Sequence, residues 1–70
     1  MSVAKVIEIS AASDKSFEDA ITNGIAKATE TVRDIKGAWV KEQQVKVEDG
    51  KITEYLVTLR VIFVLEETGG

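Results

Sequence analysis

The sequence predicts an α+β protein of one domain, in which a three-stranded antiparallel sheet wraps around one helix in the order β-α-β-β. A short run rich in β-branched residues lies near the N-terminus, and a stripe of apolar residues at helical spacing follows it. Two segments of alternating character, joined by Asp49-Gly50, complete the chain, and Asp-Gly is a strong hairpin signal. The domain is expected to span residues 1–70.

The first strand is expected over residues 3–10, VAKVIEIS, because β-branched residues dominate this short run. A polar break follows it. Ser16 then begins a capping box in which Asp19, three residues later, stands in for the usual Glu, and Ser13 is an alternative start. These signals place the beginning of the helix near residue 16.

Apolar residues recur every three or four positions after Ser16, and this stripe predicts an amphipathic helix of about five turns. Its members are Phe17, Ala20, Ile21, Gly24, Ile25, Ala28, Val32 and Ile35. Gly37 is expected to end the helix, because glycine most readily adopts the left-handed conformation that follows a helix C-terminus.

The two remaining strands are expected over residues 38–48 and 51–66. In the first of them, the apolar phase shifts between Val40 and Val45, which predicts a β-bulge near Gln43. The last strand turns one alternating set toward the helix, namely Tyr55, Val57, Leu59, Val61, Phe63 and Leu65. Its other face is mixed and includes Ile52, Leu56, Ile62 and Val64.

Seventy residues form only a marginal core on their own, so a chain of this length needs additional support. The absence of Cys and His excludes disulfides and the commonest zinc ligands, which leaves oligomerisation. One helix cannot cover both faces of the hairpin. The second apolar face is therefore expected to be buried against other copies of the chain.

Composition argues against several classes of partner. The formal net charge is −3, and nine basic residues are interleaved with twelve acidic ones, so we expect no nucleic-acid partner. The N-terminus lacks a signal-peptide pattern, and no segment approaches the ~20 apolar residues of a membrane span. A cytoplasmic protein without a membrane partner is expected.

The inventory of reactive side chains is poor, because His and Cys, the common base and thiol nucleophile, are both absent. Paired carboxylates occur at Glu18-Asp19, Glu48-Asp49 and Glu66-Glu67, at a helix start, a turn and a tail. They are interpreted as capping or solvated residues. We therefore predict no enzyme, no catalytic residue and no metal ligands within one chain, although carboxylates of different copies could together hold calcium.

Trp39 is the single tryptophan, and in a hairpin without bulges it would face Arg60. A cation–π contact of roughly 0.5–1 kcal/mol is then expected, although a bulge would shift the register by one residue. Strand alternation points Trp39 away from the helix. Two interpretations follow, an anchor at a subunit interface or a surface on which a ligand stacks.

Four segments resemble the dodecins, which are small flavin-binding proteins: KVIEI at 5–9, SFEDA at 16–20, VEDGKI at 47–52 and VTLRVIFVLEE at 57–67. The similarity runs from Val3 to Glu67. It implies a strand-helix-strand-strand protomer that assembles as a hollow homo-dodecamer. It also implies pairs of riboflavin or FMN held between tryptophans of neighbouring subunits, for storage and photoprotection without turnover.

This chain departs from the family pattern at two positions. Dodecins typically follow the helix with Trp-Phe-Glu-Val, so Gly37 occupies the stacking position and Trp39 the Glu position. Leu56 stands where the family commonly has a flavin-binding Gln. The candidate cofactor-binding residues are therefore Trp39, Gly37, Leu56 and Arg60.

At these residues FMN or riboflavin would bind weakly, move to Trp39, or not bind. The alternative is a structural or cation-binding cage without flavin.

Overall fold

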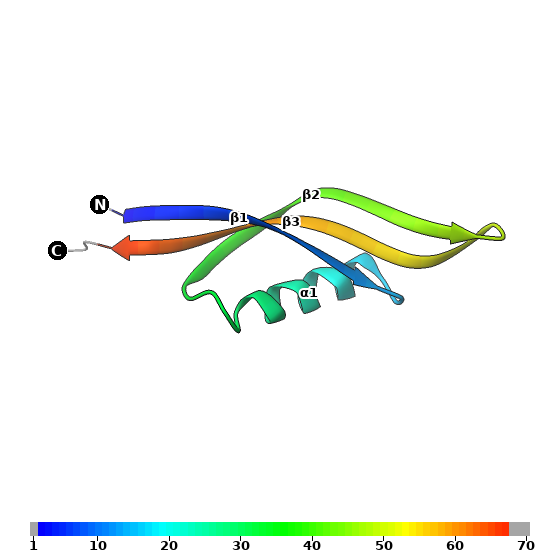
Figure 1. Cartoon of the computed structure of the whole chain (residues 1–70), viewed down its shortest axis with the longest axis horizontal. Coiled ribbons are helices and arrows are strands. Elements are labelled where there is room, and N and C mark those ends of the chain that lie inside the picture. Colours follow the sequence, from blue (N-terminus) through cyan, green and yellow to red (C-terminus); the bar gives the residue numbers. More distant parts are fainter. Residues whose placement is uncertain (1, 68–70) are drawn as a thin grey trace.

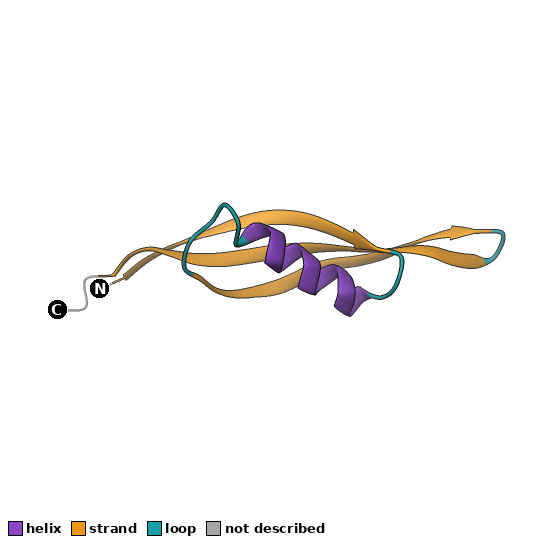
Figure 2. Cartoon of the chain, turned by 90° about the horizontal axis from the view of Figure 1, so that it is seen from below, coloured by secondary structure: helices purple, strands orange, loops and turns teal. Residues whose placement is uncertain are grey.

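The computed structural model describes residues 2–67 as three strands and one helix: β1 (Ser2–Ser13), α1 (Phe17–Ala28), β2 (Ile35–Glu48) and β3 (Lys51–Glu67). The sheet is antiparallel, with β3 between β1 and β2. Figures 1 and 2 show α1 lying against one face of this sheet. The predicted β-α-β-β fold class is confirmed.

The start of α1 follows the predicted cap. Asp19 N donates to Ser16 Oγ at 2.9 Å, which satisfies one of the unpaired amides of the first turn. The return arm of the capping box is replaced, because the Asp19 carboxylate accepts from Ser13 Oγ at 2.6 Å. Ser13 Oγ also accepts from Lys15 N at 2.9 Å, so Ser13 closes the turn between β1 and α1.

The predicted end of the helix is wrong. The helix ends at Ala28 after 12 residues, and Val32 and Ile35 lie beyond it. Val32 N still donates to Ala28 O at 2.9 Å, while the Thr29 hydroxyl donates to Ala26 O at 2.7 Å. Such local hydroxyl bonds compete with a continuing helix, and Ile35 pairs with Phe63 in the sheet instead.

Gly37 therefore does not cap the helix. It lies inside β2, opposite Ile62. The left-handed residue before β2 is Asp34, with φ 58°. Asp34 O accepts from Val64 N at 3.1 Å, which ties the connecting segment to the central strand.

The core lies between α1 and the central strand. Val57, Leu59 and Val61 of β3 are almost fully buried, as is Ala20 of α1. Burial of each large apolar side chain contributes about 1.5–3 kcal/mol. The residues that pack around this core are Ile7, Ile9, Ala11, Phe17, Ile21, Ile25 and Ile35.

The β2–β3 pairing contains three register shifts, and the two that lie between the turn and Trp39 cancel; the third lies between Ile35 and Gly37. One shift, between Lys46 and Val47, adds a residue on β3, and the other, between Val40 and Glu42, adds Lys41 on β2. The second lies at Lys41, two residues before Gln43, near which the bulge was predicted, and Gln43 itself pairs regularly with Val57. Because each bulge displaces the register in the opposite sense, Trp39 faces Arg60 as it would in a regular hairpin.

The hairpin extends well beyond the N-terminal end of α1, and the chain measures 58 × 19 × 14 Å (Figure 1). Near the turn, the apolar side chains of Val47 and Ile52 are therefore exposed. No helix within residues 2–67 combines the length and the apolar character that crossing a membrane requires.

Candidate ligand-binding site

The outer face of the sheet is the face opposite α1, and Trp39 lies on it. Arg60 sits between Leu59 and Val61, whose side chains are buried toward α1, so alternation turns Arg60 to the outer face. Trp39 is the cross-strand partner of Arg60 and shares its face. Trp39 is 46% exposed, as expected for a residue whose side chain points away from the helix.

Two cations share one carboxylate beside Trp39. Glu8 of β1 faces Arg60 across the sheet, and its Oε1 accepts from Arg60 Nε at 3.3 Å. The same oxygen accepts from Lys41 Nζ at 3.2 Å. We call Glu8, Trp39, Lys41 and Arg60 the Trp39 cluster; it crosses all three strands, and its charged side chains are partly exposed.

The cation–π contact expected between Trp39 and Arg60 is not found among the described residues. Arg60 instead directs its Nε toward Glu8. A guanidinium in contact with a carboxylate gains a charge-assisted hydrogen bond, which is stronger than its attraction to an exposed ring. The predicted cross-strand pairing of Trp39 with Arg60 is confirmed, whereas the predicted cation–π contact between them is not.

The two cations lower the pKa of Glu8. The hydrogen bond and charge of Lys41 are the main causes, and Arg60 adds a smaller effect in the same direction. Both cations favour the ionised carboxylate, and together they outweigh the small cost of removing it from water. Glu8 is therefore an anion that holds both cations at neutral pH.

Gly37 leaves open space next to Trp39 on the outer face. It lies opposite Ile62, two residues along β2 from Trp39. A Cβ placed on Gly37 would meet only the Cδ1 atom of Ile62, at 4.0 Å. The position predicted to hold the stacking ring in dodecins is therefore sterically free here.

Leu56 shares the outer face but lies far from Trp39. It is four residues before Arg60 on β3, which corresponds to about 13 Å along a strand. Its cross-strand neighbours are Ala12 and Gln44. One chain thus brings Trp39, Gly37 and Arg60 together and leaves Leu56 apart.

Sequence reasoning missed Glu8 and Lys41. Glu8 had a usable signal, because it alternates with Ile7 and Ile9 and so belongs on the face opposite the core. Lys41 had none, because its direction depends on which residue of β2 forms the bulge.

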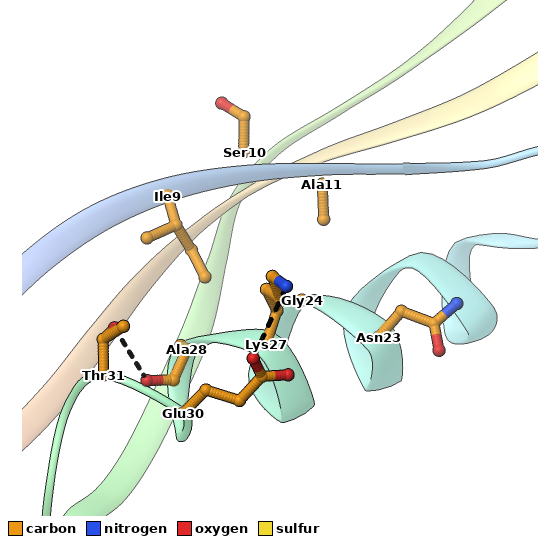
Figure 3. A pocket seen from close by; sticks show the side chains of 9 residues that line it. All are labelled: Ile9, Ser10, Ala11, Asn23, Gly24, Lys27, Ala28, Glu30 and Thr31. Atoms are coloured by element: carbon orange, nitrogen blue, oxygen red, sulfur yellow. Dashed lines mark hydrogen bonds and ion pairs between the residues drawn. The ribbon is translucent and has the colours of Figure 1, made fainter.

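A separate hollow of about 540 Å³ lies between α1 and β1 (Figure 3). Ile9 and Ala11 point into it from β1, and the Lys27–Glu30 ion pair lies at its rim with 3.4 Å between Nζ and Oε1. None of the predicted site residues lines this hollow. Residues 2–67 also contain no group of three or more His, Cys, Asp or Glu side chains placed to hold a metal.

Comparison with known proteins identifies the family. The family model described as Dodecin matches residues 3–66. The chain belongs to the dodecin family. This confirms the resemblance carried by its four sequence segments.

Individual dodecins match along nearly their whole length. The calcium dodecin of Mycobacterium tuberculosis is 44% identical over 64 residues, which covers 90% of this chain and 89% of that protein. The dodecin of Thermus thermophilus is 36% identical over 66 residues, covering 94% of this chain and 96% of that protein. The solved dodecin of Streptomyces davaonensis superposes with a TM-score of 0.88 at 32% identity, over 94% of this chain and 97% of that one.

Proposed function

We propose that this protein is a non-enzymatic dodecin that forms a hollow homo-dodecamer and holds a flavin-class ligand weakly on Trp39. The observation that carries the proposal is the partly exposed Trp39 ring on the outer face, beside the open space at Gly37. A flat ring stacked on an indole gains about 0.5–1.5 kcal/mol beyond its area burial. The aromatic surface has thus moved two residues along β2 and has not disappeared.

Assembly is part of the same proposal. Within one chain a ligand on Trp39 has only one indole face, and Leu56 is too far away to touch it. A second copy that covers the outer face supplies both a second Trp39 and the burial that Val6, which is 45% exposed, lacks in the single chain.

The ligand is held more weakly than the family pattern implies, for two reasons. Gly37 has no aromatic ring at the position where dodecins typically stack one, and Leu56 offers no hydrogen bond to the polar edge of a flavin. A storage or buffering role without turnover follows from the chemistry present. The chain has no His or Cys, and Glu8, the acid of the Trp39 cluster, is already paired with two cations.

Titration with riboflavin, followed by quenching of flavin fluorescence, tests this function. We expect quenching in the wild type and at least about fivefold weaker binding in Trp39→Ala, which corresponds to about 1 kcal/mol of lost stacking. Trp39→Phe serves as a matched control that keeps an aromatic ring and part of the affinity. Tight quenching that persists in Trp39→Ala would remove Trp39 from the site.

A cation-binding cage is the second candidate, and one observation favours it: the relative that is 44% identical is named a calcium dodecin. Because no cluster of acids within residues 2–67 is placed to hold a metal, such a site requires carboxylates from several copies. Calorimetric titration with calcium distinguishes the candidates. Heat of calcium binding in a protein that leaves riboflavin fluorescence unquenched would favour the cage.

A further inference from the structure

Asn23 is the only asparagine of the chain, and a glycine follows it. Asparagine is a thermolabile residue, because the backbone amide of the next residue can attack its side-chain carbonyl carbon. The attack meets least hindrance before glycine, which has no Cβ beside the attacking nitrogen. The two glutamines, Gln43 and Gln44, would have to close a less favourable six-membered ring. Asn23 is therefore the side-chain amide of this chain most prone to the reaction.

The reaction needs no partner except water. Ring closure joins Gly24 N to Asn23 Cγ, and the side-chain nitrogen leaves as ammonia after taking the proton of the Gly24 amide. Water then opens the five-membered imide at either of its two carbonyl carbons. One opening leaves aspartate at residue 23, and the other leaves isoaspartate, in which the main chain runs through Cγ. No atom is oxidised or reduced in either step.

The fold holds Asn23 in a conformation that does not react. Residues 23 and 24 lie inside α1, where the Gly24 amide donates to the carbonyl four residues earlier and is not free to attack. Ring closure also requires ψ of residue 23 to turn far from the helical value of about −42°. The side-chain amide is itself engaged, because Asn23 Nδ2 donates to Asp19 Oδ2 at 3.1 Å. Each of these constraints lasts only while α1 is formed.

Packing against the sheet prevents the local rotation that ring closure needs. A Cβ on Gly24 would lie 3.0 Å from Ala11 Cβ and 3.4 Å from Leu59 Cδ1, so the backbone of α1 lies close against the strands at this point (Figure 3). Gly24 is buried, whereas Asn23 is exposed to water. The peptide between them therefore turns only when α1 leaves the sheet.

We propose that Asn23-Gly24 is a self-modification site, which stays intact while α1 is docked on the sheet and deamidates when α1 opens. Its rate is the rate of the open chain multiplied by the fraction of molecules in which α1 is open. Either product places a second carboxylate beside Asp19, whose own carboxylate is held by Ser13 Oγ at 2.6 Å. Like charges four residues apart destabilise a helix, so the modified chain holds α1 less firmly.

Mass spectrometry of the full chain during incubation in mildly alkaline buffer tests the proposal, because replacing an amide by an acid raises the mass. We expect the native protein to deamidate at least about tenfold more slowly than the same protein unfolded in urea. Peptide mapping should place the change at residue 23. Equal rates in the native and unfolded protein, or no reaction in urea, would overturn the proposal.

Variants of the helix cap assign the protection to α1. Ser16→Ala removes the hydroxyl that accepts from Asp19 N at 2.9 Å, and it should speed deamidation of the native protein about fivefold. Ser16→Thr keeps a capping hydroxyl and should react at close to the wild-type rate. Ser10→Ala is the matched control outside α1, because the exposed Ser10 side chain points away from the helix (Figure 3). A wild-type rate in Ser16→Ala, or an equal acceleration in Ser10→Ala, would contradict gating by α1.

Asn23→Asp supplies one product directly and tests its effect on the helix. Asn23→Ala is its control, because it loses the same hydrogen bond to Asp19 without adding a charge. At neutral pH the amides of α1 should exchange hydrogen about twofold faster in Asn23→Asp than in Asn23→Ala. Equal exchange in the two variants would show that the added carboxylate does not loosen α1, and that part of the proposal would be wrong.

Discussion

At the scale of residues, the tryptophan of this chain lies away from the position at which the dodecin resemblance expects it. Gly37 and Trp39 point to the same face of β2, two residues apart, so the largest ring of the chain sits about 7 Å from the position the resemblance assigns to it. The space at Gly37 is open, and its backbone is ordinary strand conformation. A ring can therefore be returned to that position without rebuilding β2.

Gly37→Trp is predicted to tighten riboflavin binding about tenfold, because a second indole would lie on the outer face beside Trp39. The added side chain meets only Ile62 Cδ1 near its Cβ, so the fold should tolerate it. Fluorescence titration measures the change, and Gly37→Ala controls for the loss of glycine. Unchanged affinity in Gly37→Trp would show that position 37 does not line the ligand site.

Glu8 predicts how stability depends on pH. Its pKa is lower in the folded chain than in the unfolded one, so its ion pairs with Lys41 and Arg60 stabilise the fold above pH 4.5. That contribution is lost as the pH falls below this value through the folded pKa. Glu8→Gln should therefore lose less stability than the wild type between about pH 6 and pH 3, as measured by thermal unfolding. Equal losses of stability in the wild type and Glu8→Gln over this pH range would contradict the ion pairs of Glu8 with Lys41 and Arg60.

At the scale of elements, strand alternation was a better guide than helical periodicity. The alternation in β3 correctly assigned Val57, Leu59 and Val61 to the buried face and Arg60 to the opposite face. A strand that is buried on one face alternates buried and exposed side chains. The helical stripe continued to Ile35 in sequence, but the helix stopped at Ala28. Pairing of Ile35 with Phe63 in the sheet outweighed a local periodic preference.

The packing of α1 on β1 depends on a glycine. A Cβ on Gly24 would lie 3.0 Å from the Cβ of Ala11 and 3.4 Å from Leu59 Cδ1. The Ala11 Cβ is fixed to the strand backbone and cannot rotate away. The close approach of helix and strand therefore requires a residue without a side chain at position 24.

Gly24→Ala is predicted to lower the free energy of unfolding by about 1 kcal/mol, even though alanine favours a helix, because overpacking costs more than the gain in propensity. Combining it with Ala11→Gly should remove the clash and give a favourable coupling of at least about 0.5 kcal/mol. Chemical denaturation at one fixed protein concentration measures both. A stabilised Gly24→Ala protein would show that the helix can shift away from β1.

At the scale of the whole molecule, the single chain is too extended to be a complete structural unit. Its radius of gyration is 14.7 Å, whereas about 11 Å is typical of a compact domain of this length. The hairpin beyond α1 and the outer face both leave apolar side chains exposed, including Val6, Val47 and Ile52. Other copies of the chain are the proposed cover for these surfaces.

The sequence predicted the need for assembly but only part of the candidate site. A short chain without disulfides and with a hairpin that is apolar on both faces is enough to predict oligomerisation. Arg60 was predicted and strand alternation could have found Glu8, whereas the direction of Lys41 could not be predicted, because it depends on which residue of β2 forms the bulge. Bulges are set by local twist and leave little trace in composition.

The mass of the protein in dilute solution tests most directly whether identical copies cover the exposed hairpin. Light scattering after size-exclusion chromatography, repeated over a dilution series down to low micromolar concentration, measures it. We predict a dodecamer of the 7.6 kDa chain that persists throughout the series and unfolds as its assembly is lost. A cooperatively folded monomer of 7.6 kDa that stays stable on dilution would contradict the account.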